Sequence, residues 1–142
     1  MGRYKKGLAV AVAGAALTVG MSAGPASATS YTLYCDTSSA SGAGTINGWV
    51  SGATSLGVIL SVYDAKADGH HVAIRLIAKN DGGGVLTPWP WHHNYKGYDE
   101  SLTLSTTAGY SAGMYDVGIE VATFEGDTEL NYCRDWLRSD QT

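Results

Sequence analysis

The sequence predicts a small all-β protein: an antiparallel β-sandwich, or a barrel, closed by one disulfide. Several segments alternate apolar and polar residues with a period of two, which is typical of strands that bury one face. Clusters of glycine, aspartate and asparagine separate these segments, and such clusters favour turns. No window shows the apolar stripe of a helix. Short strands joined by glycine-rich turns indicate a compact sandwich or barrel.

The elements follow from the same pattern, taken in chain order. Residues 29–35 alternate and should form a first or edge strand, whereas the composition of 38–44 indicates a flexible loop. Further strands are expected at residues 45–50, 57–64, 71–78, 101–107, 115–125 and 128–134. Alternation in 115–125 directs Glu120 to a polar face, where we expect it to be solvated. Residues 125–127 should form a hairpin turn, and residues 135–138 can add one short turn.

The first 28 residues have the three parts of an export signal. Arg3, Lys5 and Lys6 precede an apolar run, and a small polar stretch ends in Ala28. The apolar run is shorter than the ~20 residues needed to span a membrane, so an uncleaved anchor is the weaker interpretation. We therefore expect a signal peptide at 1–28 and a single secreted, extracellular β domain at 29–142.

The charge of the expected domain limits its partners. Residues 29–142 contain six Lys and Arg against 13 Asp and Glu, a formal charge of −7. An acidic chain of this kind is not expected to bind nucleic acid or to insert into membranes. The six cations form no cluster in the sequence.

The chain has two cysteines, Cys35 and Cys133, one near each end of the expected domain. An exported protein meets an oxidising environment, so we expect them to pair rather than to leave a free catalytic thiol. The bridge would close a loop of about 98 residues and stabilise the fold by about 4–5 kcal/mol in the chain-entropy model. It would also fix the first strand beside the last.

A loop at residues 88–98 is unusually rich in aromatic side chains. Two prolines disfavour a central strand there. The aromatic side chains either cover an open end of the core or form a recognition surface, since Trp and Tyr are enriched at binding hot spots. Two tyrosines of the first strand are further candidates, because a strand edge can pair with another chain. The candidate partner-binding residues are Trp89, Trp91, His92, His93, Tyr95, Tyr98, Tyr31 and Tyr34.

The sequence contains no convincing catalytic or metal-binding motif. Neither G-x-S-x-G nor H-E-x-x-H occurs, so the sequence predicts a non-catalytic protein without a cofactor, although two distant carboxylates could still meet. Adjacent histidines, as at 70–71 and 92–93, point to opposite faces of a strand. One histidine from each pair could meet in space, yet the spacing matches no closed zinc motif, and no metal site is predicted.

Two short segments carry a resemblance to known proteins. The first contains Tyr63, Asp64, Lys66, Asp68, Gly69, His70 and His71, followed by Val72, Ile74 and Arg75. The second is Cys133-Arg134-Asp135. Together with the export signal and the two terminal cysteines, they resemble small secreted actinobacterial disulfide-bonded β proteins, including the strut-like small subunit of umbrella toxin particles. The resemblance implies a role as a link between a repeat-bearing toxin chain and a lectin-like subunit.

The function expected from the sequence is therefore a secreted, non-catalytic protein–protein interaction module whose partners are other secreted proteins. Two alternatives remain open. One is a carbohydrate-binding module that uses Trp89, Trp91 and Tyr95, because aromatic rings stack on sugars. The other is an inhibitor that inserts the Pro-Trp-Pro-Trp segment into the cleft of a secreted hydrolase.

Overall fold

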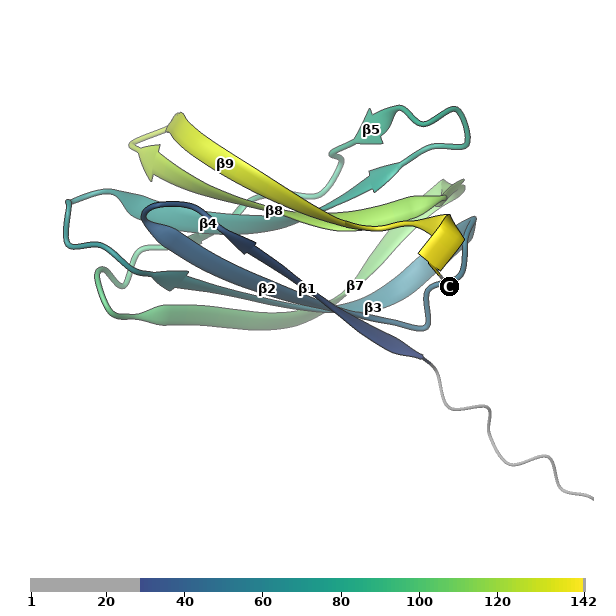
Figure 1. Ribbon diagram of the computed structural model, residues 1–142, viewed down its shortest axis with the longest axis horizontal. Coiled ribbons are helices and arrows are strands. Elements are labelled where there is room, and N and C mark those ends of the chain that lie inside the picture. The colour runs from purple at the N-terminus through teal and green to yellow at the C-terminus, as the bar shows by residue number, and fades with distance from the viewer. Residues whose placement is uncertain (1–28, 142) are drawn as a thin grey trace, which may run out of the picture.

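The computed structural model describes residues 29–141 and shows two antiparallel β-sheets packed face to face (Figure 1). The expected signal peptide at 1–28 lies outside the described residues. One sheet has the order β1-β2-β3-β7. The other has the order β5-β4-β8-β9, with β6 pairing to β4. The predicted β-sandwich is thus confirmed. Within 29–141, no helix has the length and apolar character needed to cross a membrane.

The nine strands account for most of this part of the chain. Their bounds are β1 Ser30–Asp36, β2 Ala40–Asn47, β3 Ala53–Asp64, β4 His71–Lys79, β5 Val85–Leu86, β6 His92–Asn94, β7 Ser101–Met114, β8 Asp116–Glu125 and β9 Thr128–Leu137. A short 3₁₀ helix, η1, follows at Ser139–Gln141. The strand therefore continues through residues 135–137, where the sequence suggested a turn, and the turn comes later.

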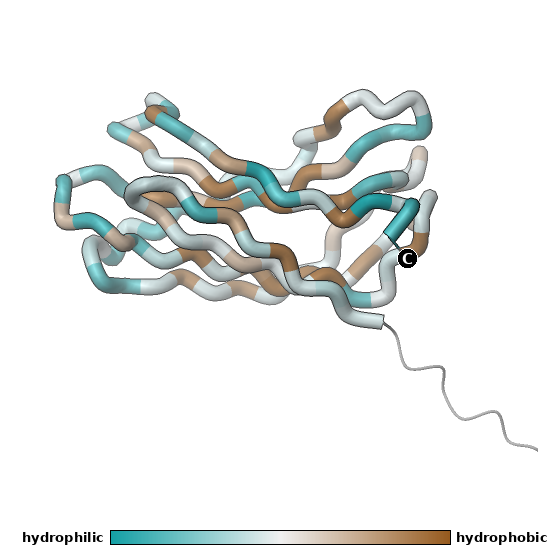
Figure 2. The backbone as a smooth tube through the Cα atoms, viewed as in Figure 1, coloured by the Kyte–Doolittle hydropathy of each residue, from teal (hydrophilic) through white to brown (hydrophobic). Residues whose placement is uncertain are grey.

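The core lies between the two sheets and is built from the predicted alternation. Figure 2 shows apolar segments recurring along the strands, with hydrophilic residues at the connecting loops. Val58, Leu60 and Val62 of β3 face Ile74 of β4 and Ile119 of β8, and all are at most 1% exposed. Burial of such side chains contributes roughly 1.5–3 kcal/mol each, which is the main source of stability in a sandwich.

The prediction of a flexible loop at 38–44 is wrong, because residues from Ala40 onward belong to β2. Gly42 and Gly44 point into the sandwich, where the sheets approach too closely for a side chain. A Cβ on Gly42 would lie 2.2 Å from Cγ2 of Val121, and one on Gly44 would lie 2.4 Å from Cγ2 of Ile119. Glycine here permits close sheet packing rather than a turn.

The strand predicted at 45–50 ends earlier, at Asn47. Beyond that point the residue that is buried is Trp49, not Val50 as the alternation predicted. Val50 is 66% exposed, whereas Trp49 is buried and its indole N–H donates to the carbonyl of Met114 at 3.1 Å. Trp49 thus fills the end of the core. The strand predicted at 101–107 is longer than expected and continues to Met114.

One long side of the sandwich is closed by the disulfide between Cys35 on β1 and Cys133 on β9, with a Cα–Cα distance of 5.9 Å. The pairing predicted from the sequence is confirmed, and it joins the first strand to the last. The backbone N–H of Tyr34 also donates to the Asp135 carboxylate at 3.0 Å. This side is therefore fixed by a covalent and a polar link.

Candidate functional site

The outer faces of the two sheets differ in chemistry. The face of the β1-β2-β3-β7 sheet carries small hydroxyl side chains, which pair across strands. The Thr32 and Thr45 hydroxyls lie 3.3 Å apart, and those of Ser61 and Thr103 lie 2.9 Å apart. We call this surface the hydroxyl face. Its exposed large side chains are Tyr34 and Ile59. Its four strands contain no tryptophan or arginine, and no described ion pair crosses them, so it is the less suitable of the two for tight protein binding.

The outer face of the β4-β8-β9 sheet carries large aromatic and charged side chains, and we call it the aromatic face. Register brings three charged residues into one row, with Arg75 opposite Glu120 and Glu120 opposite Arg134. The aromatic face is defined by Arg75, Trp91, Glu120, Tyr132, Arg134 and Trp136.

Glu120 lies at the centre of this face and is 1% exposed, so the expectation that it is solvated is wrong. Arg75 donates to Oε1 from Nη2 at 2.7 Å and from Nε at 3.1 Å. Arg134 donates from Nε to Oε2. A carboxylate can be buried in this way because both of its oxygens accept charge-assisted hydrogen bonds. The alternation of residues in β8 predicted the correct face for Glu120 but not its burial.

Aromatic rings cover the cations of this face. The Arg75 guanidinium lies 4.3 Å from the ring centroid of Trp91, and that of Arg134 lies 5.0 Å from Tyr132. Lys79 Nζ lies 4.7 Å from the ring of Trp136. Such cation–π contacts hold the side chains in one arrangement. The face is therefore ordered before any partner arrives, which reduces the entropy lost on binding.

A cluster of histidine and aromatic rings adjoins this face. His71 Nε2 and His93 Nδ1 lie 2.9 Å apart, so one histidine from each adjacent pair does meet in space. The His71 ring stacks on Phe124, and the His93 ring stacks on Tyr95. Burial is the main cause that lowers the pKa of both histidines, and the neighbouring His71 lowers the pKa of His93 further. Both rings are therefore neutral at pH 7.

The aromatic loop divides between the two sides of the β4-β8-β9 sheet. Trp89 packs against the main core, and with His92 it lines a mostly apolar pocket of about 220 Å³ beside β7. Trp91 instead packs on the outside against Phe124. The sequence left two roles open for the aromatic side chains of this loop: to cover the core or to form a recognition surface. Trp89 covers the core, whereas Trp91 lies on the outer surface. Its pairing of His92–Asn94 with β4 makes this division possible.

The remaining candidates of the sequence are scattered. Tyr31 packs against the core at the edge of β1, whereas Tyr34 is 67% exposed. Tyr98 is exposed and lines a second pocket at the end of the sandwich, where Tyr95 also lies. The structure thus unites Trp91, His93 and Tyr95 beside the aromatic face but leaves the others elsewhere.

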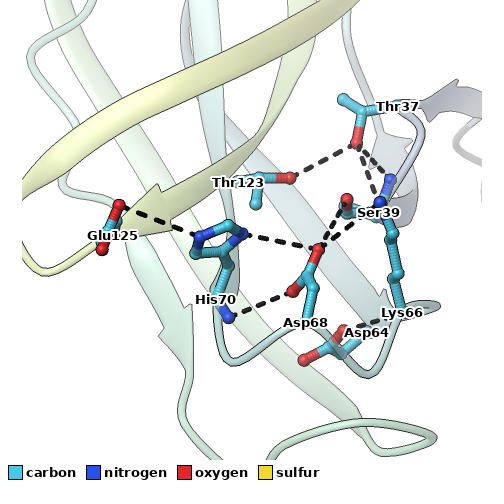
Figure 3. A network of polar contacts seen from close by, with 9 residues as sticks. Thr37, Ser39, Asp64, Lys66, Asp68, His70, Thr123 and Glu125 are labelled. Carbon is cyan, nitrogen blue, oxygen red and sulfur yellow. Dashed lines mark hydrogen bonds and ion pairs between the residues drawn. The ribbon is translucent and has the colours of Figure 1, made fainter.

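A polar network surrounds the β3–β4 loop at the same end of the molecule (Figure 3). Asp68 accepts hydrogen bonds from the backbone N–H of His70 at 3.0 Å and from the Ser39 hydroxyl at 3.3 Å. The backbone bond from His70 is the main reason that the pKa of Asp68 lies below its usual value. This network fixes the loop that follows β3. Within residues 29–141, no group of three or more His, Cys, Asp or Glu side chains is arranged to hold a metal ion.

Comparison of the chain with protein-family models, with curated proteins and with solved structures finds no significant match. The resemblance to toxin-particle subunits therefore stays a prediction. Sequence reasoning did not select Glu120, Arg134, Tyr132 or Trp136 as a site. A signal existed for two of the three charged residues, because Arg75 and Glu120 lie opposite the apolar positions of their strands, whereas Arg134 alternates with Leu130 and Tyr132. The alignment of the three in one row requires the strand register.

Proposed function

We propose that this protein is a secreted, non-catalytic module that binds another secreted protein through the aromatic face. The observation that carries the proposal is the gathering of Trp91, Tyr132 and Trp136 around two arginines and a lysine on one sheet surface. Trp, Tyr and Arg are the residues most enriched at the centres of protein interfaces. The opposite sheet carries small hydroxyl side chains, so the two faces are not equivalent.

The charge distribution favours a partner with carboxylates around an apolar patch. Residues 29–142 carry a formal charge of −7, yet three of their six cations, Arg75, Lys79 and Arg134, lie on this face. An acidic partner surface would be repelled elsewhere, whereas here it would meet a row in which two guanidiniums share one carboxylate and leave a net positive charge. Exposed Leu130 and Tyr132, 44% and 54% exposed, supply apolar area beside them.

The resemblance in sequence extends the proposal to a structural role. A rigid sandwich with a binding face on one sheet suits a subunit that links a repeat-bearing toxin chain to a lectin-like chain. This structural role is supported by the sequence resemblance and not by the geometry of the aromatic face.

The alternatives receive less support from the geometry. A sugar platform of Trp89, Trp91 and Tyr95 is disfavoured because Trp89 lies on the core side of the sheet and Trp91 on its outer side. An inhibitory loop that enters an enzyme cleft should protrude, but both tryptophans are half-buried against the protein itself.

The test is size-exclusion chromatography of culture medium from the native producer, with a C-terminal tag and mass spectrometry of the peak. Wild type should elute in a defined complex, and the double variant Leu130→Ser/Tyr132→Ser should elute alone. Ile59→Ser, at a 40% exposed apolar position on the hydroxyl face, is the matched control and should stay in the complex. A wild-type protein that elutes free, or equal loss in the control, would contradict the proposal.

A further inference from the structure

A buried carboxylate with one unpartnered oxygen lines the pocket at the end of the sandwich. Asp64, the last residue of β3, is 1% exposed. Its Oδ1 accepts a hydrogen bond from the backbone N–H of Lys66 at 3.2 Å (Figure 3). Its Oδ2 has no hydrogen-bond partner among the described residues. Buried polar groups in folded proteins are nearly always paired, because an unpaired one loses its hydration without compensation.

The neighbouring carboxylates are already engaged. Asp68 accepts from His70 and Ser39, and Asp99 Oδ1 accepts from the Tyr63 hydroxyl at 2.6 Å. Among residues 29–141, Asp64 is the one acidic residue that lines this pocket of about 290 Å³. Asp64 therefore supplies the one carboxylate oxygen of the lining that has no hydrogen-bond partner among the described residues.

The pocket is held open by the backbone of two loops. The N–H of Asp64 donates to the carbonyl of Glu100 at 3.1 Å, and its carbonyl accepts from the N–H of Asp99 at 2.9 Å. Buried Asn94 donates from Nδ2 to the same Glu100 carbonyl at 2.8 Å and accepts from the N–H of Lys96 at 3.1 Å. These bonds fix the β6–β7 loop against the end of β3. A preformed site of this kind does not lose loop entropy when a ligand binds.

Aromatic and imidazole rings form part of the wall, beside Lys66 and the small residues Ala67, Gly69 and Gly97. Tyr95 and Tyr98 line the pocket and are 73% and 57% exposed, so their rings are available to a ligand. His71 lines it as well, and burial keeps the pKa of that ring below its ordinary value, so it presents a neutral surface at pH 7. A carboxylate beside tyrosine rings is the combination that recognises organic cations.

A metal ion suits this set poorly. Ca²⁺ takes about 6–8 oxygen ligands and Mg²⁺ needs near-octahedral geometry. One carboxylate with aromatic neighbours does not supply such a shell. An ammonium or guanidinium group instead needs one or two acceptors and gains from aromatic faces.

We propose that this pocket binds an organic cation, an alkylammonium or guanidinium group, through Asp64 Oδ2 and the rings of Tyr95 and Tyr98. Two sources share this chemistry: a lysine or arginine side chain of another protein, and a free amine. Lys66 also lines the pocket, but its ammonium lies 3.9 Å from the Asp68 carboxylate and its side chain is 58% exposed. The site goes beyond the proposed function and does not depend on it.

The proposal is tested by titrating the disulfide-bonded domain, followed by NMR chemical shifts and calorimetry. The probes are the blocked amino acids N-acetyl-lysine methylamide and N-acetyl-arginine methylamide, and butylamine as the free amine. The ε-acetylated lysine probe is the neutral control. We expect saturable binding of the cationic probes with shifts at residues 64–71 and 94–99, and none with the neutral probe. If butylamine binds as well as the blocked amino acids, a free amine is the source. Preference for the blocked amino acids indicates a protein side chain.

Variants separate the contribution of the Asp64 carboxylate to binding from that of the tyrosine rings. Asp64→Asn has the same shape without the charge and should weaken binding about tenfold or more. Tyr98→Phe should bind as wild type, whereas Tyr98→Leu should bind about threefold more weakly, because only the former retains a ring. Lys66→Gln removes a like charge from the rim and should tighten binding, which keeps the test available if Asp64→Asn fails to fold.

Several results would overturn the proposal. These are no binding of any cationic probe, equal binding of the neutral probe, unchanged affinity in Asp64→Asn, or shifts at these residues produced by CaCl₂ alone. A further control is Tyr132→Ser on the aromatic face, which should bind the probes as wild type does. Loss of partner binding in that variant with probe binding intact would show that the two sites are independent.

Discussion

Arg75 donates two hydrogen bonds to a single oxygen of Glu120, from Nη2 at 2.7 Å and from Nε at 3.1 Å. Arg134 binds the other oxygen from the opposite neighbouring strand. The row Arg75–Glu120–Arg134 therefore crosses β4, β8 and β9 at one register position. A slip of one residue in either pairing would turn the charged side chains toward the core, so the row makes the observed register the favoured one.

Replacement of Glu120 by alanine should destabilise the fold strongly. Two guanidiniums, 18% and 32% exposed as side chains, would be left facing each other without a counter-ion. We expect the free energy of unfolding to fall by about 3 kcal/mol in urea denaturation. The apolar triple variant Arg75→Met/Glu120→Met/Arg134→Leu should regain most of the loss, because it leaves no unpaired charge. A triple variant as unstable as the single one would show that the row matters for other reasons.

Gly42→Ala should lower the free energy of unfolding by about 1–3 kcal/mol through overpacking. Its Cβ would lie 2.2 Å from Cγ2 of Val121, a buried side chain with little freedom to move. Gly57→Ala is the matched control, because the nearest atom to its Cβ is 3.6 Å away and the residue faces outward. The control should change stability by no more than about 0.5 kcal/mol. Equal effects of the two substitutions in thermal or urea unfolding would refute the close-packing explanation.

Stability should decrease as the pH falls from about 7 to 5. Burial lowers the pKa of His71 and His93 in the folded protein below the ordinary value of 6.5, so the unfolded chain binds more protons in this window. Above about pH 7.5 both states are neutral and the effect disappears. The lowered pKa values of Asp68 and Asp116 act at lower pH, below 3.8.

The histidine contribution can be isolated by substitution. His93→Gln should flatten the pH dependence of urea unfolding, whereas His92→Gln, on the other face of the strand, should preserve it. An unchanged slope in His93→Gln would mean that the pair does not control stability in this range.

Reduction of the Cys35–Cys133 bridge should lower the free energy of unfolding by about 4–5 kcal/mol, since it releases a loop with a sequence separation of 98. The comparison is urea unfolding with and without a phosphine reductant. The variant Cys35→Ser/Cys133→Ser should match the reduced protein. If the reduced and oxidised forms unfold at the same urea concentration, the bridge stabilises little beyond the strand contacts around it.

Much of the fold could be predicted because most strands bury one face, so apolar residues recur at every second position of the sequence. Strands β4 and β8 were located almost to the residue by that signal. The first part of strand β2 was missed because its inward positions include Gly42 and Gly44, which have the composition of a loop. Glycine is needed at these positions because the two sheets approach closely there. A local sequence pattern does not show the distance between two sheets.

The candidate site was less predictable for a related reason. Alternation assigns Glu120 to the outer face, but its burial depends on arginines from two other strands. The loop with Trp89 and Trp91 has aromatic character throughout, and only the pairing of β6 with β4 decides which ring faces inward. The partnerless oxygen of Asp64 has no sequence signature, because it arises where two loops meet.

The disulfide has a mechanical consequence for a protein held at its two ends. Tension applied between Ser30 and Gln141 would run through the covalent bridge, and the chain between the cysteines would carry no load. That segment is roughly 330 Å long when extended, at ~3.4 Å for each of 98 residues. In single-molecule stretching, this length should be released only after reduction. The oxidised domain would behave as an almost inextensible connector.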